Sequence, residues 1–172
     1  MLSEQMQETF IFIDYRENKS GIPEKLDSLG TKIKQSTLTV GDYLINNHIL
    51  IERKSATDFI KSLVSNRLWD QYSRLRNSRF RTLIIIEGDE FKTTYQVDYN
   101  GVQGALIAVA ISWQLPILFS KGHEHTCKIL TMIQSREMKE EIFRLYPIRK
   151  SKNWQSQNSI SVRITRCRKI DG

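Results

Sequence analysis

Short apolar runs alternate with helix-forming segments along this chain, and this alternation restricts the fold more than any other feature. Residues 83–86 are uninterrupted Leu and Ile, as expected of a strand that is covered on both faces. Four runs are predicted to be strands outside the hairpin described below: 9–14, 31–38, 82–88 and 115–120. Five segments are predicted to be helices: 23–30, 55–64, 67–79, 100–113 and 123–137. The alternation predicts an α/β layered fold, with a central sheet of about five or six strands and helices on both faces.

Residues 41–54 (GDYLINNHILIERK) are predicted to form a β-hairpin with residues 46–48 as its turn. If the hairpin is symmetric about Asn47, Asp42 lies opposite Glu52 on the adjacent strand. Like charges directly opposite each other destabilise a sheet. A positive group is therefore expected beside this pair.

Lys54 meets that expectation, because side chains two residues apart on a strand leave from the same face as each other. It shares the face of Glu52, whereas Arg53 faces the other way. Asp14 ends the first predicted strand, and functional groups gather at the carboxyl ends of strands in open α/β sheets. Carboxylates bind Mg²⁺, and a lysine beside a metal-bound water is typical of metal-assisted phosphodiester hydrolysis. The acids expected to share one pocket are Asp14, Glu17, Asp42 and Glu52.

The 172 residues, 40% of them apolar, are enough for one sizeable hydrophobic core. We expect a folded domain over 9–146, a short extension over 1–8, and a basic polar tail or linker over 147–172. The tail holds seven of the 26 Lys and Arg residues and one acid. It is either an arm that lies along phosphates or a solubilising or linking segment.

No run approaches the roughly 20 apolar residues of a membrane span, and the N-terminus lacks the features of a signal peptide. Cys127 and Cys167 lack the spacing of a metal-binding or disulfide motif. We expect an intracellular protein with reduced thiols and no membrane association.

Four segments, in this order, resemble the nuclease domain of the XPF-type structure-specific endonucleases: DYRE (14–17), TLTVGDYLI (37–45), IERKSATDFIKSLVSNRLWDQ (51–71) and LIIIEG (83–88). The resemblance runs from about residue 9 to about residue 137. It implies a restriction-endonuclease-like fold with a mixed central sheet. It also implies an endonuclease, dependent on Mg²⁺ or Mn²⁺, that cuts branched DNA such as 3′ flaps and forks near the junction.

Carried over by position, the resemblance implies that Asp14, Asp42 and Glu52 hold the metal. The implied catalytic residues are Asp14, Glu17, Asp42, Glu52, Arg53, Lys54 and Asp58. Asp58 is also the third helical position of the capping box SATD, so it either caps the helix, acts at the site, or does both. No organic cofactor is expected.

The segment from Arg67 to Arg81 carries five arginines and one acid, so its arginines are candidates for phosphate contacts. The alternative is a solvated helix face. Together with a basic residue of the first motif, the predicted DNA contacts are Arg16, Arg67, Arg74 and Arg76. The family pairs through its nuclease domains, which implies a homodimer or a heterodimer. The predicted helix over 100–113 is either a core helix or part of that interface.

Two departures from the family pattern stand out. Asn66 replaces a common glycine, although asparagine also tolerates left-handed backbone. Residues 138–172 are too short and polar for the tandem helix-hairpin-helix domain of many members, so the chain is either a piece of a longer protein or a natural short form.

Two other functions compete with the structure-specific nuclease. One is a catalytically weak or inactive DNA-binding scaffold subunit, and the other is a less selective nuclease. A small-molecule α/β enzyme is disfavoured because no Gly-rich phosphate loop is present. The resemblance implies that the protein works with DNA, in the cytoplasm or nucleoid of a prokaryote or the nucleus of a eukaryote.

Overall fold

The computed structural model describes residues 9–88, 91 and 98–145. The chain divides into two compact units, Met1–Lys139 and Glu140–Gly172. Of the second unit only the last turns of a helix are described, so the fold that follows is that of the first. The predicted extension (1–8) and tail (147–172) lie outside the described residues.

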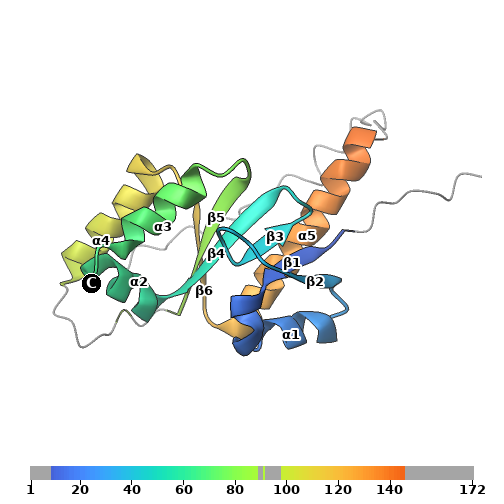
Figure 1. The fold of residues 1–172 in the computed structure, drawn as a ribbon, viewed down its shortest axis with the longest axis horizontal. Coiled ribbons are helices and arrows are strands. Elements are labelled where there is room, and N and C mark those ends of the chain that lie inside the picture. Colours follow the sequence, from blue (N-terminus) through green and yellow to red (C-terminus); the bar gives the residue numbers. More distant parts are fainter. Residues whose placement is uncertain (1–8, 89–90, 92–97, 146–172) are drawn as a thin grey trace, which may run out of the picture. The chain divides into compact units, whose positions relative to one another are not determined.

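A six-stranded mixed sheet forms the centre of the first unit, as predicted (Figure 1). Its strands, in spatial order, are β2 (Ile33–Ser36), β1 (Ile11–Asp14), β3 (Tyr43–Ile45), β4 (Ile49–Ser55), β5 (Arg81–Glu87) and β6 (Ile117–Ser120). β3 runs antiparallel to β1 and β4, and the other neighbouring pairs are parallel. The carboxyl ends of β4, β5 and β6 therefore meet at one edge of the sheet.

The hairpin has the register that symmetry about Asn47 predicts. Tyr43 pairs with Ile51, and Ile45 pairs with Ile49. Asn46 and Asn47 have φ of 52° and 53°, the left-handed conformation that the favoured hairpin turns require. Asparagine adopts it more readily than most residues, which explains why the turn forms here.

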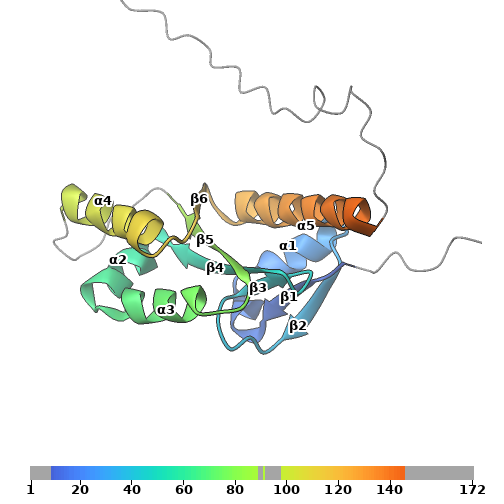
Figure 2. The ribbon, with the colours of Figure 1, turned by 90° about the horizontal axis from the view of Figure 1, so that it is seen from above.

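Helices cover both faces of the sheet, and alternate residues of each strand pack against different helices. Leu44 and Leu50 belong to one buried cluster, with side chains of α2 (Ala56–Val64), α3 (Arg67–Arg76) and α4 (Tyr99–Ile107). Tyr43 and Ile51 belong to the other, with side chains of α1 (Ile22–Ser28) and α5 (His123–Leu145). Figures 1 and 2 show α2, α3 and α4 grouped around one half of the sheet, and α1 and α5 around the other.

Four features of the fold differ from the predictions or go beyond them. The segment after β1 forms a 3₁₀ turn over Tyr15–Lys19, because the Asp14 side chain accepts from a backbone N–H and caps it. Asp98 caps α4, accepting from Gly101 N at 2.6 Å. A π-helical turn over Ala108–Ser112 follows α4, and α5 continues to Leu145, beyond the predicted end at 137. No helix in the described ranges is long and apolar enough to cross a membrane.

Candidate active site

Three of the predicted acids lie side by side on neighbouring strands. Asp14 ends β1, Asp42 immediately precedes β3, and Glu52 lies within β4. The backbone N–H of Asp14 donates to the carbonyl oxygen of Asp42 (2.9 Å), and the N–H of Asp42 to that of Ile51 (2.8 Å). Extending the two registers by one residue places Asp42 between Asp14 and Glu52. Residues opposite each other share a face of the sheet, so the three side chains leave from the face that carries Leu44 and Leu50.

Asp42 is a buried carboxyl, 9% exposed. Its Oδ2 accepts from the backbone N–H of Arg53 at 2.9 Å. Burial, and then the charge of Glu52, raise the pKa of Asp42 to about 8, although the Arg53 N–H opposes the shift. Without a cation, Asp42 is therefore mostly protonated at neutral pH.

Glu52 and Lys54 share a face, as predicted. Glu52 Oε1 lies 3.8 Å from Lys54 Nζ, and both side chains are largely buried. Lys54 Nζ also donates to Ser62 Oγ of α2 at 3.5 Å. Burial raises the pKa of Glu52, while the charges of Lys54 and Arg16 partly offset that effect. Asp42, Glu52 and Lys54 thus lie together where β4 packs against α2.

Asp14 is held differently from its neighbours. Its Oδ1 accepts from Arg16 N (2.9 Å) and Arg16 Nε (2.6 Å), and its Oδ2 accepts from Leu38 N (2.7 Å). Burial opposes ionisation, but these hydrogen bonds and the Arg16 charge outweigh it and keep the pKa of Asp14 below its usual value. Arg16 Nη2 also donates to Gly41 O at 3.1 Å. The exposed Arg16 guanidinium therefore lies beside the acids, and its pKa is raised by Asp14 first and by Asp42 and Glu52 as well.

Arg53 and Glu17 belong to a second cluster. Arg53 forms two hydrogen bonds to Glu87, Nη2 to Oε1 at 2.6 Å and Nε to Oε2 at 3.0 Å. Its Nη1 lies 3.4 Å from Glu17 Oε2, which also accepts from the Tyr43 hydroxyl. Arg53 thus faces away from Lys54, as predicted. Glu17 lies close enough to the acids for its charge to raise the pKa of Asp42.

Sequence reasoning assigned no site role to Glu87, the centre of this second cluster. It is 7% exposed, and besides Arg53 it accepts from Thr126 Oγ1 at 2.6 Å and lies 3.0 Å from His123 Nε2. Burial would raise its pKa, but the hydrogen bonds from Arg53 and Thr126 outweigh burial and lower it. The available signal was an acid at the carboxyl end of an otherwise apolar strand.

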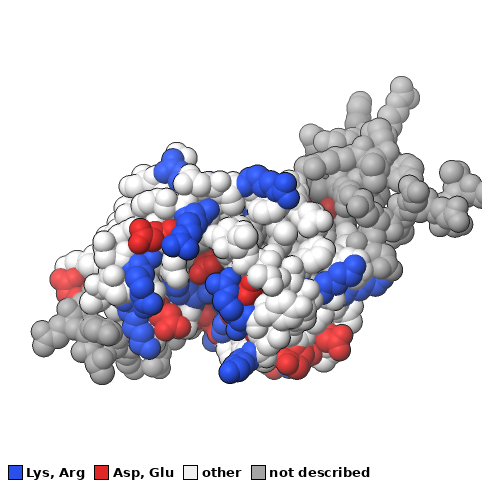
Figure 3. Space-filling view, in the orientation of Figure 1, with Lys and Arg blue, Asp and Glu red and all other residues white. Residues whose placement is uncertain are grey.

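The remaining predicted residues are not drawn into either cluster. Asp58 is exposed and lies 3.6 Å from Lys61, while its backbone N–H is capped by Ser55 Oγ at 3.0 Å. Arg67 Nε donates to Ser65 Oγ at 3.0 Å. Arg74 and Arg76 are exposed on α3. Figure 3 shows Lys and Arg side chains beside acidic ones on the face seen in Figure 1.

The donor chemistry fits a hard divalent cation. Asp42 and Glu52 are buried oxygen donors whose mutual repulsion a bound cation would relieve. Within the described part of the chain, however, no three His, Cys, Asp or Glu side chains are arranged to hold a metal ion. Both oxygens of Asp14 are already hydrogen-bonded. Mg²⁺ usually needs only one or two carboxylates, because it keeps waters and takes substrate phosphate oxygens, so the pair Asp42 and Glu52 fits such an ion.

The comparisons with known proteins indicate one family of nuclease domains. Residues 13–133 match the ERCC4 domain family. The structure of XPF from Aeropyrum pernix in complex with DNA superposes with a TM-score of 0.72 at 28% identity, covering 77% of this chain and 66% of that one. The 3′-flap repair endonuclease Xpf of Saccharolobus solfataricus is 33% identical over 127 residues, which are 73% of this chain and 54% of that protein.

A protein of Methanocaldococcus jannaschii that carries the name of an ATP-dependent RNA helicase is 32% identical over 131 residues, 76% of this chain. That match covers only 16% of the relative. The chain spans about half of one of these two curated relatives and a much smaller share of the other.

Proposed function

The chain belongs to the ERCC4 domain family of XPF-type nuclease domains, and we propose that it is a metal-dependent, structure-specific DNA endonuclease. It hydrolyses a phosphodiester bond near the junction of branched DNA, such as a 3′ flap or a fork. Support for this substrate comes from the names of two relatives, a 3′-flap repair endonuclease and an XPF in complex with DNA. We therefore expect the protein to act on DNA inside the cell.

One observation carries the proposal: Asp42 and Glu52 are buried together beside Lys54. Both acids can be ionised together only if a cation compensates their charge, and Asp42 is otherwise protonated. A single ammonium 3.8 Å from one of the two acids compensates only part of that charge. A purely structural or scaffolding subunit would have no use for this arrangement, which disfavours the inactive-subunit alternative.

Each residue of the candidate site has its own proposed role in the hydrolysis. Asp42 and Glu52, with Asp14 beside them, would hold Mg²⁺ or Mn²⁺, which when bound supplies an activated water and neutralises phosphate charge. Asp42 gives up its carboxyl proton as it becomes a ligand, since only the carboxylate coordinates well. Lys54 Nζ donates to the attacking water or to a phosphate oxygen. The exposed Arg16 guanidinium offers a bidentate contact to non-bridging phosphate oxygens.

Arg53 is a positioning residue in this scheme. Its guanidinium is held by Glu87 and Glu17, and its backbone N–H holds Asp42 Oδ2. Arg53 therefore fixes the strand between Glu52 and Lys54 rather than contacting DNA. Arg67, Arg74 and Arg76 are proposed phosphate contacts along α3. Asp58, in the first turn of α2, is proposed to cap the helix, to act at the site, or to do both.

A dimer partner is also proposed. Ile107 and Ile111, on α4 and the π-helical turn, are 57% and 71% exposed, and Leu118 and Phe119 on the edge strand β6 are 42% and 54% exposed. Apolar side chains gathered on consecutive elements of a surface are typical of a protein–protein contact. Their occupant is proposed to be a second nuclease domain, identical or not.

The test is cleavage of a labelled 3′-flap and fork set by the chain alone, in Mg²⁺, compared with linear duplex. Wild type should cut the branched substrates near the junction, and Asp42→Ala and Glu52→Ala should lower cleavage by at least roughly a hundredfold, as for loss of a group that acts in the transition state. Lys34→Gln, on the edge strand β2, is the control. Undiminished cleavage by both acid variants contradicts the site, and equal cutting of linear duplex contradicts the substrate class.

A further inference from the structure

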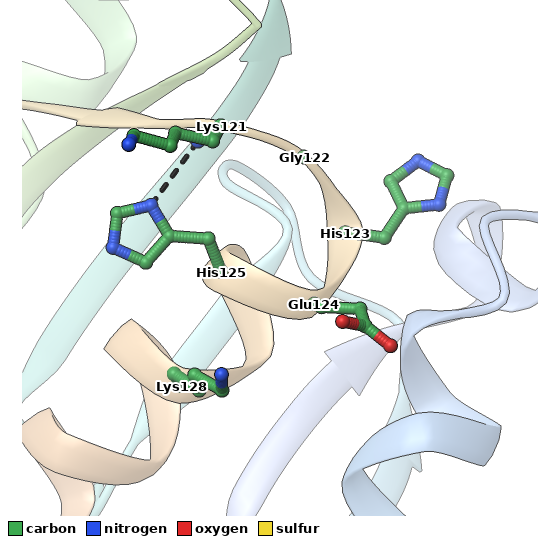
Figure 4. Close-up of a pocket in the computed structure, with 6 residues that line it drawn as sticks. All are labelled: Lys121, Gly122, His123, Glu124, His125 and Lys128. Carbon is green, nitrogen blue, oxygen red and sulfur yellow. Dashed lines mark hydrogen bonds between the residues drawn. The ribbon is translucent and has the colours of Figure 1, made fainter.

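A cavity lies outside the proposed catalytic acids, where the chain leaves β6 and enters α5. Its volume is about 660 Å³, and it is lined by Lys121, Gly122, His123, Glu124, His125 and Lys128. Figure 4 shows Lys121, His125 and Lys128 on one side of this turn and His123 and Glu124 on the other. The mechanism proposed above uses none of these six residues.

The charges in the cavity favour an anion. Glu124, its one acid, is bound to Lys25 of α1 at 2.8 Å. Lys121 and Lys128 form no ion pair with any residue that the structure describes, and both are exposed. His125 lies between them, and its Nδ1 accepts from Lys121 N at 3.1 Å (Figure 4). Two ammonium groups and an imidazole thus border a space whose carboxylate is already neutralised.

The cavity lies along the same sheet edge as the proposed catalytic residues. Gly88 N donates to Ser120 O at 2.7 Å, so the ends of β5 and β6 are joined beside the cavity. His123, from the other side of the turn, lies 3.0 Å from Glu87, the acid that holds Arg53. Neighbouring strands are about 4.8 Å apart, so β6 lies roughly 10 Å from β4 across the sheet. A DNA strand carries one phosphate per 3.4 Å or so of helix axis, so this separation places the cavity within a few phosphates of the acids.

We propose that this cavity binds a backbone phosphate of the DNA substrate, a few nucleotides from the bond that is cut. Lys121 and Lys128 hold the non-bridging phosphate oxygens, and His125 donates to them from its free ring nitrogen. The contact reads no base, because it engages only the backbone. The proposal rests on the proposed function for its substrate, and it adds a contact that is separate from the metal-binding acids and from the arginines of α3.

Binding of a fluorescent fork duplex tests the proposal without requiring catalysis. Anisotropy is measured in EDTA over a series of salt concentrations for wild type, the double variant Lys121→Gln/Lys128→Gln, and each single variant. One phosphate contact contributes about 0.9 to the slope of log affinity against log salt, so the double variant, which removes both lysines from the one phosphate, should lose about 0.9 of the slope and bind roughly tenfold more weakly near 100 mM salt. Each single variant should lose less of the slope than the double variant, because the other lysine still contacts the same phosphate.

Lys34→Gln is the matched control for each single variant, since it also removes one positive charge, from an exposed position on β2 outside the cavity. It should leave the slope within error of wild type. Equal slopes for wild type and the double variant overturn the proposal, as does an equal loss in Lys34→Gln, which would indicate a general charge effect. So does the absence of any fork binding by wild type.

The two proposals fail separately. Wild type that binds the fork with the predicted loss in the double variant, but does not cut it in Mg²⁺, supports the phosphate site and contradicts only the catalytic function. Wild type that cuts forks while the double variant binds and cuts them unchanged contradicts only the phosphate site.

Discussion

Asp42 is the residue whose protonation most directly links the candidate site to stability. Its pKa is about 8 in the folded protein, against about 3.9 for an aspartate in an unfolded chain. Between these values the unfolded state binds fewer protons than the folded state, so the stability that the protonated carboxyl contributes is complete below about pH 4 and is lost as the pH rises toward 8. A divalent cation should restore stability at the high end of this range.

We therefore expect Asp42→Asn to flatten the pH dependence. In EDTA at pH 8 the variant should be more stable than wild type by roughly 2–4 kcal/mol, and at pH 4 the two should be similar. Denaturant unfolding at several pH values measures the difference. Asp27→Asn, an exposed acid on α1, should follow wild type throughout. Parallel curves for wild type and Asp42→Asn would show that the carboxyl is not perturbed.

Glu87 allows a second prediction at this scale. Glu87→Gln removes the charge that holds Arg53, which is 13% exposed, and leaves a buried guanidinium without its main partner. Breaking one side of a buried pair in this way should lower the free energy of unfolding by roughly 3–5 kcal/mol. Urea titration measures the loss. The exposed pair of Lys25 and Glu124 provides the contrast, because Glu124→Gln should produce no measurable change; equal losses in the two variants would contradict the role given to Glu87.

At the scale of elements, the backbone at Gly41 lies in close contact with Leu50 of β4. Gly41 has φ of 77°, and a Cβ there would lie 2.7 Å from Leu50 Cδ1. Gly30 has a similar φ of 72° but nothing within 4 Å of the same position. Gly41→Ala adds a steric clash to the backbone strain, whereas Gly30→Ala adds the strain alone.

We expect Gly30→Ala to cost about 1 kcal/mol and Gly41→Ala to cost roughly 1–3 kcal/mol more. The clash also displaces the strand that carries Glu52, so Gly41→Ala should lower Mg²⁺-dependent cleavage as well, and Gly30→Ala should not. Thermal unfolding and the flap assay check the two effects. Equal costs in the two variants would show that the Leu50 side chain moves aside at no cost in free energy.

The strands and the hairpin register were predictable because local rules determine them. Period-two alternation and a turn centred on Asn47 suffice to put Asp42 opposite Glu52. The cap of α4 was not predictable, because Asp98 and Asn100 are both good caps and only the tertiary path selects between them. The π-helical turn over Ala108–Ser112 leaves no sequence signal at all.

In the candidate site, the face shared by Glu52 and Lys54 was predictable, and the contacts of Glu87 were not. Glu87 meets His123 and Thr126 only because β5, β6 and α5 pack together, and these partners lie more than thirty residues away. Long-range pairing of this kind depends on the whole fold, whereas the alternation along β4 depends on one strand.

At the scale of the molecule, the apolar surface of α4, the π-helical turn and β6 carries the last prediction. Wild type should be dimeric by light scattering at high micromolar concentration, and Ile111→Glu should shift it to monomer, because a charge would be buried in the contact. Met132→Glu is a matched control, since Met132 on α5 is also 71% exposed. A monomeric wild type, or equal effects of both variants, would contradict this interface.

The three-residue connection between β3 and β4 has a consequence for how this sequence can vary. Because Glu52, Arg53 and Lys54 alternate between faces, gaining or losing one residue between positions 45 and 49 would turn the guanidinium toward Asp42 and send the ammonium beneath α5. Point substitutions there need only preserve the bend, but insertions and deletions would invert the chemistry of the strand. The number of residues in this turn should thus tolerate change far less than their identities do.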